Sequence, residues 1–164
     1  MICHQRRYYT FSYNYMNAEQ HYINLYRTMM FQIRRSVVRG GIVVNAKPLF
    51  ILTLIEAIRQ GLPNPNIFWY SDCLKEIYSE KWKSFFPNMV PTPICKPYYH
   101  LVNDGFWNIK WKAGIVEPPA TDKKIRENVE YGYLDNALWD VLQEEETRQY
   151  FESQIISYFL SDTK

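Results

Sequence analysis

The stretch Asn45–Gly61, NAKPLFILTLIEAIRQG, has the composition of a helix at the centre of a domain. Its seven large apolar residues leave almost no polar face, which is typical of a helix buried on nearly every side. Pro48 suits the first turn of a helix, and a glycine suits the position just after its end. We therefore expect a buried helix over residues 48–60 to organise the fold.

Amphipathic and turn patterns place further elements on both sides of this helix. Apolar residues spaced by three and four predict a helix over 18–33. The same spacing predicts another helix through about Phe85, with Ser71 or Asp72 as its N-cap. The basic stretch 34–46, RRSVVRGGIVVNA, contains two adjacent glycines and predicts a loop or short turn. Helices are also expected over 123–132, 136–142 and 146–160.

A small sheet is expected in the middle of the chain. IFWY at 67–70 fits a short strand, whereas 87–97 has four prolines in eleven residues and predicts an extended loop. The Asn103-Asp104-Gly105 turn signal between YYHLV and FWNIKWK predicts a hairpin. In its second strand, large apolar residues alternate with Asn108, Lys110 and Lys112, so one face should pack into the core and the other should carry cations.

The sum is an α+β fold, mostly helical, with a small antiparallel sheet or hairpin. The length of 164 residues and the 47% apolar content fit one domain with a real core. We expect residues 16–164 to form this domain and residues 1–15 to be an N-terminal extension.

The cysteines and histidines indicate which metal sites and which redox environment the chain is suited to. The three cysteines include no CxxC pair, and no cysteine–histidine set has the spacing of zinc ligands. The sequence therefore predicts no metal and no cofactor, and it indicates a reducing, cytoplasmic environment. The longest apolar run is too short to span a bilayer, so no membrane association is expected.

Charge is distributed unevenly along the chain. Residues 1–60 hold eight basic and two acidic side chains, whereas residues 127–164 hold nine acidic and two basic ones. Such asymmetry suggests a polarised surface on which a polyanion could dock. Ordinary solvated surface is the alternative reading of the same pattern.

Lys47 is an unusual residue for the start of a helix, because the helix dipole disfavours a cation there. A bound phosphate would reverse this cost, since it accepts hydrogen bonds from the first N–H groups of a helix. Arg34, Arg35 and Arg39 lie just upstream and would add charge to such a site. The alternative is that Lys47 is simply exposed and that Pro48 alone starts the helix.

The stretch ICKPYYHLVNDGFW mixes basic residues with apolar and aromatic ones. A core alone would not include the basic residues, and a phosphate site alone would not need the apolar ones. Lys96 and His100 flank an apolar proline ring, Pro97, and an aromatic side chain, Tyr98. One interpretation is a ligand site with an apolar wall and a basic rim. The other places the tyrosine in the core and leaves His100 as a satisfied polar side chain.

Three stretches in this order resemble the sulfur-binding domain of type IV restriction endonucleases and related HNH nucleases. They are NAKPLFILTLIEAIRQG, KPYYHLVNDGFWNIKWK, and the segment from KKIREN to SYFL. The resemblance covers about residues 30–160. It implies recognition of double-stranded DNA in which sulfur replaces one non-bridging phosphate oxygen.

The resemblance also implies site residues. Pro97 matches the proline of the sulfur pocket, with Lys96, Tyr98 and His100 completing or rimming the cavity. The family pattern often has an aromatic residue before this proline and a smaller residue at the His100 position, so this chain departs from it twice. Residues implied in DNA binding are Arg34, Arg35, Arg39, Asn45, Lys47, Asn103, Lys123, Lys124 and Arg126. Among these, Arg39, Asn45 and Asn103 are candidates for reading base edges.

The nuclease half of such proteins needs a histidine-rich ββα-metal motif with cysteine pairs, and this sequence has none. We therefore expect a binding module and not an enzyme. It would act alone, or as the recognition part of a longer nuclease in a modification-dependent restriction system. The alternatives are a scaffold domain of a bacterial defence system, a generic DNA-binding domain of an HNH nuclease, and a divergent nuclease.

Overall fold

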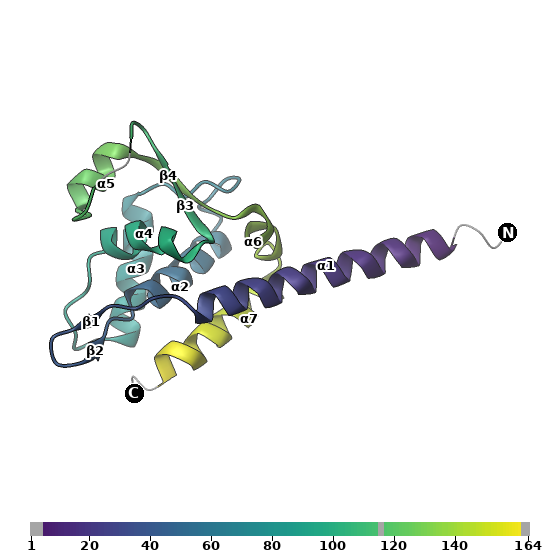
Figure 1. Cartoon of the computed structure of the whole chain (residues 1–164), viewed down its shortest axis with the longest axis horizontal. Helices are drawn as coiled ribbons and strands as arrows, with labels where there is room; N and C mark the ends of the chain where they lie inside the picture. Colours follow the sequence, from purple (N-terminus) through teal and green to yellow (C-terminus); the bar gives the residue numbers. More distant parts are fainter. Residues whose placement is uncertain (1–4, 115–116, 162–164) are drawn as a thin grey trace.

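Helices dominate the fold, and two small antiparallel sheets complete it (Figure 1). The computed structural model describes residues 5–114 and 117–161, with side chains from Asn17 onward. This architecture confirms the predicted mostly helical α+β class. In chain order the elements are α1 (Gln5–Phe31), β1 (Val37–Val38), β2 (Ile42–Val43), α2 (Ala46–Arg59), α3 (Asp72–Phe85), α4 (Cys95–His100), η1 (Leu101–Asp104), β3 (Trp107–Trp111), α5 (Asp122–Asn128), β4 (Val129–Leu134), α6 (Asn136–Val141), α7 (Glu145–Ile155) and η2 (Ile156–Leu160).

Helix α2 is the centre of the core, as its sequence predicts. Leu49, Phe50 and Ala57 are completely buried, and every other large apolar residue of the helix is buried too. The helix packs against α3, α4 and α7. Each large apolar side chain buried in this way contributes about 1.5–3 kcal/mol relative to exposure, so α2 supplies much of the driving force for folding.

Helix α1 is longer than the helix predicted over 18–33. It begins at Gln5 and passes through position 15, where the boundary of the extension was expected, without a break. In Figure 1 its N-terminal half projects away from the rest of the molecule. The C-terminal half packs on α6 and α7 and buries Tyr26 and Met30.

The predicted N-cap of α3 is confirmed. Ser71 has extended backbone geometry, and its hydroxyl oxygen accepts a hydrogen bond from the Leu74 N–H at 3.3 Å. A cap of this kind satisfies one of the N–H groups that a helix start leaves without an intrahelical partner.

The predicted hairpin over 98–112 is wrong. Residues 95–100 form helix α4, which continues into the 3₁₀ turn η1 and ends at Gly105 with a φ of 87°. The partner of β3 is β4, a strand that begins inside the region where a helix over 123–132 was expected and extends beyond it. Helix α5 stops at Asn128 because the following residues cover the core beside β3.

Gly132 allows β4 to lie close to the aromatic core. A Cβ atom at this position would lie 2.2 Å from the buried ring of Trp107 and 2.9 Å from the hydroxyl of Tyr98. The Trp107 ring also packs edge-on against Phe50 at 5.4 Å. The β4 segment VEYGYL is rich in residues that favour strands, so its conformation agrees with its local propensity, and the packing of these rings requires glycine at position 132.

The basic stretch 34–46 forms a short hairpin, β1–β2. Val37 pairs with Val43, and Val38 pairs with Ile42. Gly40 forms part of the turn with a φ of 94°, a backbone conformation that favours glycine.

Candidate nucleic-acid interface

Lys47 projects from the first turn of α2 and pairs with Asp104 at the end of η1. Its Nζ atom lies 2.5 Å from Asp104 Oδ2, and the side chains are 13% and 4% exposed. The other carboxylate oxygen accepts a hydrogen bond from the Arg34 N–H at 3.1 Å. Lys47 is therefore not simply exposed, and Asp104 joins three segments of the chain.

Two further basic residues of the candidate site, Lys96 and His100, lie on α4. Burial lowers the pKa of His100, and the positive charges of Lys47 and Lys96 lower it further. The lowered pKa favours the neutral imidazole, so the positive charges here come from the two lysines. His100 and Lys96 are half-buried on α4. We call Lys47, Lys96 and His100 the α4 basic cluster.

Asn45 precedes α2, but its side chain does not cap the helix. Its Oδ1 atom instead accepts a hydrogen bond from Arg35 at 2.8 Å. The Arg35 guanidinium also lies 4.8 Å from the ring centre of Phe159, so this arginine is held between two neighbours. Arg34 and Arg39 are exposed, the latter at the turn of the β1–β2 hairpin.

The expectation that Tyr98 lines a surface pocket is wrong. Its side chain is completely buried, its hydroxyl donates to the Phe68 carbonyl, and its own carbonyl accepts from Trp107 Nε1 at 2.9 Å. Burial also raises the pKa of its phenol. Pro97 is buried as well, so its ring does not form an open notch in this structure.

The basic residues of α5 are mostly engaged with neighbouring groups. Arg126 binds the carboxylates of Asp122 and Asp72 at 2.8 and 2.9 Å. Lys124 donates to the Glu117 carbonyl at 3.2 Å. Lys123 is the most accessible of the three, with a side chain that is 83% exposed. The α5 residues thus offer less free charge than their sequence indicates.

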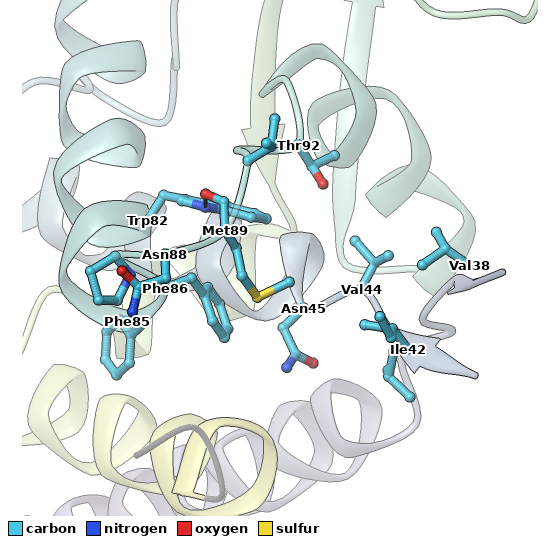
Figure 2. A pocket seen from close by; sticks show the side chains of 13 residues that line it. Val38, Ile42, Val44, Asn45, Trp82, Phe85, Phe86, Asn88, Met89 and Thr92 are labelled. Carbon is cyan, nitrogen blue, oxygen red and sulfur yellow. Dashed lines mark hydrogen bonds between the residues drawn. The ribbon is translucent and has the colours of Figure 1, made fainter. Parts of the chain in front are cut away.

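An apolar groove of about 530 Å³ adjoins the start of α2 (Figure 2). The β1–β2 hairpin forms one wall, and the end of α3 with the following loop forms the other. In Figure 2, Asn45 lies between the Met89 side and the Ile42 side of the groove. Val90 at its rim is 90% exposed, so the groove presents a large apolar surface to solvent.

The structure brings some predicted site residues together and separates others. Arg34 and Lys47 meet at Asp104, and Lys47 also belongs to the α4 basic cluster. Asn103 is exposed on η1. In Figure 1 the β1–β2 hairpin, α4 and α5 all lie toward the end opposite to the start of α1. Sequence reasoning missed Asp104 as a site residue, because the NDG triplet was interpreted only as a turn signal.

Within residues 5–114 and 117–161, no group of three or more histidine, cysteine, aspartate or glutamate side chains is arranged to hold a metal ion. Across the same residues, no helix has both the length and the apolar character needed to cross a membrane.

The fold is shared with one class of DNA-recognition domain of known structure. The sulfur-binding domain of SprMcrA, solved in complex with phosphorothioated DNA, matches with a TM-score of 0.64 and 14% sequence identity. The match covers 87% of this chain and 88% of that chain. At this identity the likeness establishes the fold. No protein-family model and no curated protein sequence matches the chain.

Proposed function

We propose that this domain binds double-stranded DNA and prefers a backbone that carries a phosphorothioate. The observation that carries the proposal is the α4 basic cluster, formed by Lys47 of α2 with Lys96 and His100 of α4, on a fold shared with a phosphorothioate-DNA-binding domain. Clustered cations attract the phosphate backbone, and phosphate contacts supply most of the affinity of DNA-binding proteins.

The preference for sulfur would come from α4. Sulfur is larger and more polarisable than oxygen, and it accepts hydrogen bonds more weakly. Contact with the Pro97 ring would therefore favour sulfur over a hydrated oxygen. Because Pro97 is buried, such a contact requires the side chains that cover its ring to move aside. Lys96 and His100 would then hold the remaining phosphate oxygens.

In this proposal the chain is a recognition module of a modification-dependent restriction system in the cytoplasm. Cleavage would belong to a nuclease domain or subunit with which the module acts. The exposed residues Arg34, Arg39, Asn103 and Lys123 would contact the backbone or base edges on either side of the cluster.

The proposal is tested by fluorescence polarisation with two labelled duplexes that differ by one sulfur atom. We expect at least about tenfold tighter binding of the thio duplex, which corresponds to about 1.4 kcal/mol. Lys47→Met should weaken binding of both duplexes and reduce the salt slope by about one. Lys83→Met is the matched control, because Lys83 is an exposed lysine on α3.

A Pro97→Ala variant separates sulfur preference from general affinity. We expect it to lower the affinity for the thio duplex more than the affinity for the unmodified duplex, so that the ratio of the two affinities falls. Equal losses on both duplexes would exclude Pro97 as the sulfur contact. Equal affinity of the unaltered chain for both duplexes would refute the preference for sulfur and leave generic DNA binding.

The apolar groove favours a second candidate, in which the chain is an interaction domain that binds another protein. Exposed apolar surface of this kind often marks a protein contact. Failure of the chain to bind either duplex would favour this candidate, since a scaffold needs no affinity for DNA.

A further inference from the structure

The outer face of the β3–β4 sheet carries side chains that the proposed function does not use. In the ladder, Lys110 pairs with Tyr131 and Asn108 pairs with Tyr133. Directly paired residues of antiparallel strands project from the same face. The neighbouring pair, Ile109 and Gly132, belongs to the opposite face, which packs on the core. A bridge between Phe68 and Gly132 adds a third short segment beside β4.

Three aromatic rings form a continuous row across this outer face. The ring of Trp69 lies 6.0 Å from that of Tyr131 at an interplanar angle of 77°. The ring of Tyr131 lies 6.0 Å from that of Tyr133 at 64°. Trp69 is 55% exposed, and both tyrosines are partly exposed. An indole left half in solvent beside two accessible phenols is unusual for a face that has no partner.

Cations accompany these rings. Lys110 and Lys112 are both exposed, and neither ammonium lies within ion-pair distance of a carboxylate among the residues that the structure describes. Glu130 is the nearby acid, on the irregular end of the ladder between Tyr131 and Val129. Asp135 already accepts a hydrogen bond from Asn108 at 3.0 Å. The two lysines are matched in number by these two carboxylates, but neither ammonium is paired with one, so both lysines remain available to a ligand.

We propose that this aromatic face binds single-stranded DNA. Unpaired bases would stack on Trp69 and Tyr131, and Lys110 and Lys112 would hold the phosphates between them. Aromatic rings on a sheet provide stacking surfaces for any base, and adjacent cations follow the backbone. A nucleic-acid strand offers bases to the exposed rings and phosphates to the free ammonium groups. An apolar peptide would cover the rings but leave both lysines without partners.

The position of this face extends the proposed duplex site. Helix α5, which carries Lys123, leads directly into β4, and Figure 1 shows it at one end of the β3–β4 sheet. A strand that separates from a bound duplex near α5 would meet the aromatic face next. The inference stands on its own observations, because a failure of sulfur recognition would leave the rings and lysines unchanged.

The test uses the full chain and a labelled single strand of about twelve thymidines, measured by fluorescence polarisation. We expect Trp69→Ala to weaken binding about tenfold or more and Trp69→Phe to keep most of it, since phenylalanine also stacks. Tyr158→Ala is the matched control, because Tyr158 is 57% exposed on η2, away from this face. Lys110→Ala should reduce both the affinity and the salt slope.

Binding to the duplexes separates this inference from the proposed function. Trp69→Ala should leave duplex affinity within about twofold, whereas Lys47→Met should weaken duplex binding and leave single-strand binding unchanged. The inference is overturned if the unaltered chain does not bind the single strand. It is also overturned if Trp69→Ala and Tyr158→Ala weaken single-strand binding equally. Circular dichroism of each variant confirms that the fold is intact before binding is measured.

Discussion

Replacing Asp104 by asparagine tests how the candidate site is built. The side chain of Asp104 is 4% exposed and that of Lys47 is 13% exposed, so removal of one charge leaves the other on a largely buried side chain. Breaking a buried pair in this way costs about 3–5 kcal/mol. The amide oxygen of asparagine can still accept the Arg34 N–H, so we expect a loss near the lower end, about 3 kcal/mol. A domain of ordinary stability survives this loss.

Urea unfolding monitored by circular dichroism gives the free energy of unfolding of Asp104→Asn. The double variant Lys47→Met/Asp104→Asn should recover most of the lost stability, because it leaves no unpaired charge. The single variant should also bind duplex DNA more tightly, since Lys47 no longer has an internal partner. A loss below about 1 kcal/mol would show that the pair behaves as a solvated surface ion pair and would refute the reasoning.

Three further predictions follow from individual contacts. Gly132→Ala forces a methyl group against the Trp107 ring, so the free energy of unfolding should fall by up to about 3 kcal/mol, measured by urea titration; an unchanged midpoint would contradict this packing. Ser71→Ala removes the α3 cap and should lower the free energy of unfolding by about 1 kcal/mol in the same assay. Ser71→Asn should keep most of the stability, because asparagine is also a good N-cap. The lowered pKa of His100 keeps its imidazole neutral near neutral pH, and a bound phosphate favours the charged form. Duplex affinity should therefore rise as the pH falls from about 7.5 to about 5.5, and this rise should be smaller in His100→Gln.

Local sequence signals predicted the parts of the fold that local physics determines. The uniformly apolar stretch of α2 has to be buried wherever the chain places it, and the Ser71 cap acts within one turn of helix. Strand β4 was missed although VEYGYL is rich in residues that favour strands, whereas its pairing with β3 and its contact with the Trp107 ring depend on other parts of the chain. A local pattern carries no information about that contact.

In the candidate site, too, local signals were informative and contacts between distant residues were not predicted. Lys47 was singled out because a cation is unfavourable at a helix start, but its partner Asp104 lies 57 residues further along the chain. Tyr98 was assigned to the pocket by the family resemblance, whereas the alternative interpretation of the same residues placed it in the core. The structure places it against Phe50 and Trp107, with ring centres 5.7 and 5.3 Å away.

The most direct test of the central claim compares two duplexes of one sequence, of which one carries a single phosphorothioate. Kd is measured for both across a range of salt concentrations. The account predicts tighter binding of the thio duplex and a linear fall of log affinity with log salt for each. Identical affinities at every salt concentration would contradict recognition of the modified backbone by this domain.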